Sequence, residues 1–308
     1  NNFSTYTFIV DRTTPTSVTP FPGALAFSST TPTFLGTATD RYCDIVDLGG
    51  GCSAGPRRYE SGILSSSVTV SLKDTSVADC AVGACWWNGS AFVQSNFPIW
   101  SSATYTGTPT SSSGTWSYVL PGNALTSPRS YQVSSRAEDR TGGFQVALTT
   151  VTFTYDTTAP VSLATAPVGA QGALTAIYGT ARDDAPGELD VVRVRIYESA
   201  GPNIGEYWNG VAWAAPEVWL ASGTILSNIS QTTWSWKMDT SSVLWDNQST
   251  YTVTAAGRDK ALNVEATHGS YDIEFTLQTP AATVAIVAPP APDMLHYKKA
   301  AGPIKFLS

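Results

Sequence analysis

Short runs in which apolar and polar residues alternate cover most of the chain. Alternation with a period of two is typical of β-strands that bury one face, and turn residues separate the runs at short intervals. No long stretch shows the helical period, so the pattern predicts an all-β sandwich or barrel. We expect strands at 24–28, 33–38, 67–72, 91–93, 115–120, 131–137 and 147–155, and again at 173–180, 191–197, 212–214, 232–237, 251–258 and 270–277.

One phrase recurs where an alternating run ends. It reads Phe-Thr-Tyr-Asp-Thr-Thr-Ala-Pro at 153–160, Tyr-Thr-Phe-Ile-Val-Asp-Arg-Thr-Thr-Pro at 6–15 and, less well kept, Tyr-Asp-Ile-Glu-Phe-Thr-Leu-Gln-Thr-Pro at 271–280. Proline has no N–H to donate and keeps the preceding residue extended, so strand pairing should stop there. We interpret each copy as the last strand of a module followed by a stiff hinge. Three hinges then bound two complete modules, and the first hinge is assigned to a missing module.

The two modules repeat the same motifs in the same order. Gly-Thr-Ala-Thr-Asp at 36–40 matches Gly-Thr-Ala-Arg-Asp at 179–183, and Trp-Asn-Gly at 87–89 matches Trp-Asn-Gly at 208–210. Further along, Trp116 matches Trp234. The predicted organisation is a strand and hinge from a preceding module or a donor strand at 1–16, one domain at 17–156, a second domain at 157–279, and a Pro-rich linker and tail at 280–308.

The combination of these motifs, found twice, resembles bacterial Ig-like modules, which are strung in long arrays on large surface proteins and adhesins. The resemblance covers residues 5–280 and implies two tandem Ig-like β-sandwiches in an extracellular protein. It also implies that neighbouring modules or other copies of the chain are the partners. The Asp-x-Ala-Gly-Asn turn usual in such modules departs from its pattern here, as Asp-Arg-Thr-Gly-Gly at 139–143 and Asp-Lys-Ala-Leu-Asn at 259–263.

Composition narrows the classes of partner. Charged residues make up 13% of the chain, against roughly 25% in soluble domains, and the formal net charge is −7. Nucleic acids and anionic membranes attract clusters of Lys and Arg, so neither is expected as a partner. No stretch of about 18 apolar residues occurs, so no insertion into a membrane is expected.

All four cysteines fall in an insertion that only the first module carries. Two local disulfides, Cys43–Cys52 and Cys80–Cys85, are our interpretation, although four cysteines allow three connectivities. Cross-links suit an insertion that has no core of its own, because they limit its freedom when unfolded. Oxidised cysteines in turn predict an extracellular or periplasmic setting.

Aspartates near the hinges are the candidates for a metal site. We expect Asp40, Asp139 and Asp156 to converge at one end of the first module, and Asp183, Asp184 and Asp259 to do so in the second. Ca²⁺ prefers six to eight oxygen ligands from carboxylates and carbonyls. The resemblance implies that some such arrays bind Ca²⁺ at module junctions. The alternative is that these aspartates cap backbone amides in turns; no cofactor is otherwise required.

Aromatic residues flank the two Trp-Asn-Gly sequences. Asn-Gly is a strong hairpin signal, and the flanking rings then form cross-strand pairs. The alternative is a platform on which Trp87, Trp208 and Trp213 stack against sugar rings. Tyr131 and Tyr251 are expected to be tyrosine corners, in which the hydroxyl bonds to the backbone upstream of its strand.

The start of the chain also alternates, at Phe3, Tyr6, Phe8 and Val10. This strand either remains from a longer array or pairs with a sheet edge of a neighbouring molecule. Signatures of catalysis are absent, since there is no Gly-x-Ser-x-Gly or phosphate-binding loop and neither histidine lies in a motif. The sequence therefore predicts a non-catalytic structural segment of an extracellular surface protein, stalk or filament. The alternative is an adhesive or carbohydrate-binding module.

Overall fold

A computed structural model describes residues 14–24, 26–40, 63, 67–76, 84–107, 113–230, 232–266 and 270–279. These residues form strands and turns, with no helix among them. The predicted donor strand, the tail from residue 280 and Cys43, Cys52 and Cys80 lie outside the described residues. Cys85 is buried, and the pairing of the four cysteines stays a prediction.

The strands up to Tyr155 form two sheets that pack face to face. The smaller sheet has the order β1-β3-β9-β8 and the larger one the order β2-β11-β10-β4-β5-β6, with β7 beside β4. The strands are β1 (Thr16–Phe21), β2 (Ala26–Ser28), β3 (Thr33–Thr39), β4 (Thr69–Asp74), β5 (Ala84–Trp87), β6 (Phe92–Ser95), β7 (Ser101–Ser102), β8 (Thr104–Thr106), β9 (Ser113–Val119), β10 (Arg129–Arg136) and β11 (Thr149–Tyr155). We call this unit the first sandwich.

The strands from Val161 onward repeat this plan. Their order is β12-β14-β19-β18-β15-β20-β21-β13, with β16 beside β15 and β17 beside β16. The strands are β12 (Val161–Ala166), β13 (Gly169–Gln171), β14 (Ala176–Arg182), β15 (Leu189–Ala200), β16 (Tyr207–Trp208), β17 (Trp213–Ala214), β18 (Leu220–Ser230), β19 (Thr233–Asp239), β20 (Thr250–Asp259) and β21 (Ile273–Leu277). The long strand β18 pairs with both sheets of this second sandwich, whereas in the first sandwich β7 and β8 divide that task.

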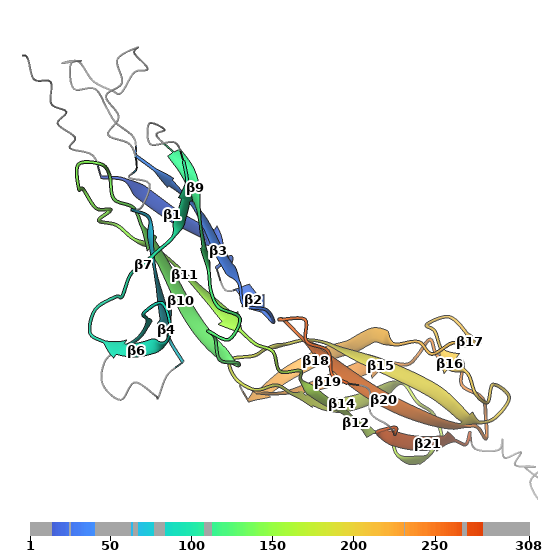
Figure 1. The fold of residues 1–308 in the computed structure, drawn as a ribbon. Helices are drawn as coiled ribbons and strands as arrows, with labels where there is room; N and C mark the ends of the chain where they lie inside the picture. The colour runs from blue at the N-terminus through green and yellow to red at the C-terminus, as the bar shows by residue number, and fades with distance from the viewer. Residues whose placement is uncertain are drawn as a thin grey trace, which may run out of the picture.

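The described residues therefore form two β-sandwiches in tandem, which lie end to end with residues 156–160 between them (Figure 1). The predicted all-β fold is confirmed. Each sandwich has its own apolar core, and the largest fully buried side chains are aromatic, including Trp116, Tyr131, Trp236 and Tyr251. Bulky buried rings contribute strongly to each core, because the stabilisation grows with the apolar area removed from water.

The tyrosine corners are present in both sandwiches. The backbone N–H of Thr126 donates to the hydroxyl of Tyr131 at 2.8 Å, and the N–H of Asp246 donates to the hydroxyl of Tyr251 at 2.8 Å. Both hydroxyls therefore satisfy a backbone group five residues upstream. This shared contact aligns the two copies residue by residue around the corner.

Two features of the repeat differ from the sequence-based predictions. Trp116 lies opposite Gly36 on the neighbouring strand, and the residue opposite Gly179 is Trp236, so Trp116 corresponds to Trp236 and the match with Trp234 is wrong. The error arose because β19 points a Trp inward at both positions, two residues apart.

The strands β1, β12 and β18 were not predicted. Strand β12 begins at Val161, directly after Pro160. A proline stops only the hydrogen bond that its own nitrogen would donate, and β12 is an edge strand that pairs only with β14. Strand β1 contains Pro20 and is likewise an edge strand. The first strand of each sandwich was therefore not predicted, because a proline lies in or directly before it and edge strands tolerate proline.

Candidate cation site at the junction of the sandwiches

Three aspartates meet where the two sandwiches join. Asp156 follows β11 at the start of the hinge, Asp183 follows β14, and Asp259 is the last residue of β20. One carboxylate oxygen from each residue lies within 4.8 Å of the other two. All three side chains are buried, with at most 2% of their surface exposed. One ligand set thus combines the hinge with both sheets of the second sandwich.

Asp156 and Asp183 each use one oxygen for a local turn. Oδ1 of Asp156 accepts hydrogen bonds from the N–H and the hydroxyl of Thr158, at 2.9 and 2.6 Å. Oδ1 of Asp183 accepts from the N–H of Asp184 at 2.9 Å. The Oδ2 atoms of Asp156 and Asp183 are buried and accept no hydrogen bond from the described residues. Capping of turns therefore explains the Oδ1 atoms of Asp156 and Asp183. It leaves their Oδ2 atoms, which lie close together, without a hydrogen-bond donor among the described residues.

Asp259 is held by Asn263. The N–H of Asn263 donates to Oδ1 of Asp259 at 2.8 Å, and its side-chain amide donates to Oδ2 at 2.7 Å. The same amide nitrogen donates to the backbone oxygen of Asp156 at 2.8 Å. Asn263 closes the turn that departs from the family pattern, and it still ties the hinge to the second sandwich. This role of Asn263 was not predicted, although the motif keeps its asparagine at this position.

A glycine leaves room beside these oxygens. A Cβ atom added at Gly187 would lie 2.3 Å from Oδ2 of Asp156, 2.8 Å from Oδ2 of Asp183 and 2.7 Å from the backbone oxygen of Asp184. Any larger residue would fill the space in which these three oxygens converge. The loop therefore leaves a gap that only glycine preserves, bordered by the backbone oxygen of Asp184, which accepts from the N–H of Gly187 at 2.7 Å.

Burial and nearby negative charge oppose ionisation of Asp183 and Asp259. The pKa of Asp183 is raised from 3.8 to about 7, first by burial and then by the negative charge of Asp156, with a smaller contribution from Asp259. Burial also raises the pKa of Asp259, against the hydrogen bonds from Asn263. No Lys or Arg among the described residues forms an ion pair with these three carboxylates. A proton or a cation is needed to balance the charge.

The donor set fits a hard cation. Three carboxylates and one carbonyl offer only oxygen, which is what Ca²⁺ and Mg²⁺ prefer, whereas Zn²⁺ prefers nitrogen and sulfur. The unpartnered Oδ2 atoms and the gap at Gly187 are the observations that support a bound cation. Asp156, Asp183 and Asp259 would hold it, and it would supply the positive charge that the carboxylates lack.

The grouping of the predicted ligands needs two corrections. Asp156 does not join Asp40 and Asp139, because the hinge turns its carboxylate toward the second sandwich. The side chain of Asp184 is 60% exposed and pairs with Arg182 at 3.3 Å, so only its backbone oxygen faces the site. Asp40 and Asp139 are buried at the positions that Asp183 and Asp259 occupy in the second sandwich.

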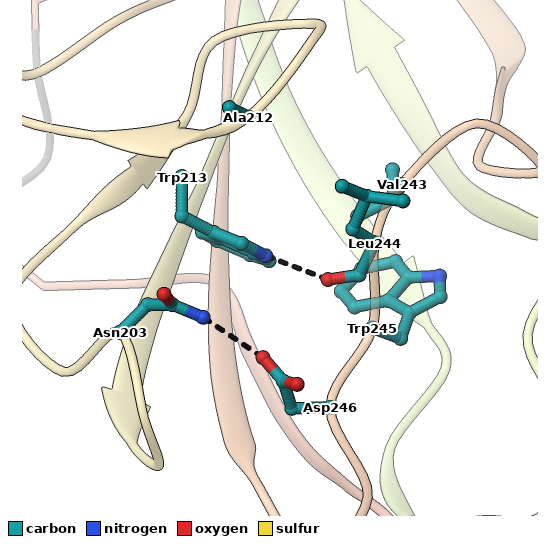
Figure 2. A pocket seen from close by; sticks show the side chains of 7 residues that line it. All are labelled: Asn203, Ala212, Trp213, Val243, Leu244, Trp245 and Asp246. Atoms are coloured by element: carbon teal, nitrogen blue, oxygen red, sulfur yellow. Dashed lines mark hydrogen bonds between the residues drawn. The ribbon is translucent and has the colours of Figure 1, made fainter.

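The structure rules out the alternative of a sugar platform for two of its three residues, Trp87 and Trp208. Only 3% of Trp87 and 1% of Trp208 is exposed, so neither ring offers a face to a ligand. Trp87 pairs with Phe92 across the β5–β6 hairpin, and Trp208 pairs with Trp213 across β16–β17. Hairpin geometry turns the first Trp of each pair into the core. Trp213 is half-buried and borders a surface hollow of about 630 Å³ (Figure 2).

Comparisons with known proteins give similarities to solved structures only. No family model matches the sequence, and no curated protein matches it. Among solved structures, the chain is similar to the fibronectin(III)-like modules of CbhA from Clostridium thermocellum, with 12% identity, 89% of this chain and 100% of that chain covered, and a TM-score of 0.32. The chicken CNTN1 FN1–FN3 domains give 13% identity, coverage of 86% and 67%, and a TM-score of 0.32.

A third similar structure is a tetra-tandem repeat in the extending region of a large adhesion protein, with 17% identity and a TM-score of 0.27. The match covers 86% of this chain and spans 48% of that one. TM-scores this low carry no argument about function. The described residues also contain no helix long and apolar enough to cross a membrane.

Proposed function

We propose that this chain is a non-catalytic spacer segment of an extracellular surface protein, stalk or filament, stiffened at its central joint by a divalent cation. The observation that carries the proposal is the buried group of Asp156, Asp183 and Asp259. One of these carboxylates belongs to the hinge and two belong to the second sandwich. A cation bound by all three therefore cross-links the hinge to the second sandwich and limits the angles between neighbouring modules.

Other contacts across the junction support a defined joint. Asn263 bonds to the backbone of Asp156, and the ammonium of Lys260 lies 5.6 Å from the ring centre of Phe27 in the first sandwich. Each contact alone is weak, with a cation–π contact worth about 0.5–1 kcal/mol at an exposed site. A cation that balances three buried carboxylates would dominate them. Calcium is the expected ion, because it accepts irregular sets of oxygen ligands.

Three further acidic residues of the second sandwich have structural partners. Glu188 pairs with Lys260, and Asp190 pairs with Arg258, both at the surface. Glu198 is fully buried and accepts hydrogen bonds from Asn203. These contacts favour a structural role for all three carboxylates.

The low content of charged residues and the cysteines of the insertion support an extracellular location, and neighbouring modules or other copies are the proposed partners.

A thermal denaturation experiment on the full chain tests the proposal. We expect added CaCl₂ to raise the Tm of the chelator-treated protein, and we expect Asp156→Asn to abolish this rise. Gly187→Ala should abolish it too, because its methyl group would occupy the site. Asp184→Asn is the matched control, since that carboxylate lies outside the site. Equal Tm values in chelator and in excess Ca²⁺ would remove the cation from the proposal.

Small-angle X-ray scattering tests the consequence for shape. The Ca²⁺-loaded chain should scatter as an elongated particle with a narrow distribution of dimensions, and the chelated chain as a broader ensemble. An unchanged profile, despite a Ca²⁺-dependent Tm, would limit the cation to a role in stability.

Binding of glycans, the second candidate function, is favoured by the hollow beside Trp213.

A further inference from the structure

The two sandwiches differ most sharply in chemistry around one tyrosine corner. Trp213 stands where the first sandwich has Phe92, because each pairs with the Trp that precedes the hairpin turn. Counting back from the corner tyrosines, Trp245 corresponds to Leu125. By the same count, Asp246 corresponds to Thr126, since the N–H of each bonds to the tyrosine hydroxyl. Two larger aromatic rings and a carboxylate are therefore gathered at one place in the second sandwich alone.

These substitutions line the hollow of about 630 Å³. Its walls come from the β16–β17 hairpin, the loop after β15 and the turn that precedes β20, and Figure 2 shows Trp213, Trp245, Asn203 and Asp246 around it. Its volume is within the range of about 300–1,000 Å³ that is usual for small-molecule sites. The indole N–H of Trp213 donates to the backbone oxygen of Leu244 at 2.6 Å, which holds the ring in one orientation.

The polar side of the hollow is also held in place. The side-chain amide nitrogen of Asn203 donates to Oδ2 of Asp246 at 2.8 Å and to Oε2 of Glu198 at 3.2 Å. The backbone N–H of Asn203 donates to Oε1 of Glu198 at 3.1 Å, and Glu198 is fully buried. The buried carboxylate of Glu198 thus holds Asn203 in place. A site whose groups are already ordered loses less entropy when a ligand binds.

The remaining polar capacity of the hollow is that of an acceptor. With its amide hydrogens directed to Glu198 and Asp246, Asn203 presents its amide oxygen, and Asp246 presents its second carboxylate oxygen. No ion pair among the described residues involves Glu198 or Asp246. Such a site suits a ligand that brings hydrogen-bond donors and an apolar face, and it repels an anion.

The geometry points to a binding site for a neutral sugar residue in this hollow, formed by Trp213, Asn203 and Asp246. The hydroxyls of a sugar ring donate to the carboxylate and amide oxygens, while the C–H face of the ring lies against an indole. Uronic acids and sulfated sugars are disfavoured by Asp246 and by the net charge of −7. The site belongs to the second sandwich only, so it adds a ligand to the spacer without depending on the junction.

The test begins with a printed array of neutral, amino-bearing and uronic-acid oligosaccharides, applied to the full chain. Titrations with lactose, cellobiose and mannobiose then follow the indole N–H signals in ¹⁵N NMR spectra. We expect neutral sugars to bind and to shift the signal of Trp213. Binding should be the same in Ca²⁺ and in chelator, so its loss and the failure of the cation site are distinguishable.

Variants that place residues of the first sandwich in the hollow test the roles of Trp213 and Asp246. Trp213→Phe and Asp246→Thr restore the residue types that a folded copy already uses, and each should weaken sugar binding about tenfold or more. Trp219→Phe, outside the hollow, is the control and should bind as the parent does. Sugar binding that survives both variants would overturn the proposal. The proposal would also fail if no neutral sugar bound. It would fail too if N-acetyl-lysine methylamide, a probe for cationic ligands, shifted the signal of Trp213 and the sugars did not.

Discussion

The two sandwiches attach their first strand to the opposite sheet by different chemistry. In the first sandwich Gln145 accepts from the N–H of Ser17 at 2.6 Å and donates to the oxygen of the same residue at 3.2 Å. In the second, one oxygen of Glu265 accepts from the N–H groups of Ser162 and Gly257, both at 2.8 Å. A neutral amide and a carboxylate thus do the same structural task.

A second carboxylate strengthens this difference. Oδ2 of Asp272 accepts from the N–H of Ala164 at 2.9 Å and from the N–H of Ala255 at 2.8 Å. Buried backbone donors must be paired, and the outer edge of β12 has no strand to pair with. The comparison teaches that the fold requires an acceptor at this place but not a charge. At its first strand, the second sandwich therefore relies on two carboxylates where the first sandwich uses an amide.

The largest expected effect is common to both copies. A Cβ added at Gly36 or at Gly179 would lie 2.2 Å from the ring of Trp116 or Trp236, and within 2.2 Å of a backbone oxygen. We expect Gly36→Ala and Gly179→Ala each to cost about 3 kcal/mol or more, because neither the ring nor the backbone has room to move. Chemical denaturation measures this, and Gly23→Ala, with open space around it, should be neutral. Tolerance at one position alone would break the equivalence of the copies.

The second effect separates the copies. Glu265→Ala leaves two buried N–H groups without an acceptor and should destabilise the protein by about 2–4 kcal/mol. Glu265→Gln keeps an acceptor and imitates Gln145, so its cost should be smaller. Urea unfolding at pH 7 measures both variants. If Glu265→Gln cost as much as Glu265→Ala, the charge itself would be required and the comparison would be wrong.

The third effect concerns pH. The pKa of Asp183 is raised to about 7 by burial and by Asp156, so the folded chain binds a proton that the unfolded chain releases near pH 4. In chelator, this contribution to stability is present below pH 4 and is lost as the pH rises through 7. With Ca²⁺ bound, the ionised form is favoured and the trend at this site reverses.

The measurement is the Tm of the parent and of Asp183→Asn at pH 5 and pH 8, in chelator and in Ca²⁺. The asparagine variant lacks the titrating group, so the difference between the two proteins isolates Asp183. A parent whose Tm in chelator rose with pH relative to Asp183→Asn would contradict the assignment.

The smallest effect tests a contact that the copies build from different strands. The guanidinium of Arg136 on β10 lies 4.2 Å from the ring centre of Trp100, and that of Arg195 on β15 lies 5.0 Å from Trp219. Each arginine substitution to Ala should cost about 0.5–1 kcal/mol, the usual range for exposed cation–π contacts. Arg136 also lies 4.8 Å from the ring centre of Phe144, and Arg195 also pairs with Glu217 at 3.0 Å, so the two costs should be similar. If the parent and the two variants unfolded with equal midpoints, these cation–π contacts would contribute nothing to stability.

Much of the fold was predictable because it follows from local pattern. Alternation identified most of the long strands, and the spacing of Tyr131 and Tyr251 predicted both corners, which depend on residues close in sequence. The Trp-Asn-Gly motif identified the hairpins for the same reason. Side-chain oxygens of Asn88 and Asn209 accept from the turn amides, and Gly89 and Gly210 supply the positive φ of 100° and 98°.

Partnerships between distant residues were decided by the tertiary structure. The sequence determined that Asp156 stands at a hinge, but only the packing of the two sandwiches brings it to Asp183 and Asp259 instead of Asp40. Likewise, the sequence determined a Trp at position 208, whereas the twist of the hairpin against the core decided that it is buried and that Trp213 is not. Alternation assigns a residue to one face of a strand, and the position of that face relative to water depends on what packs against it.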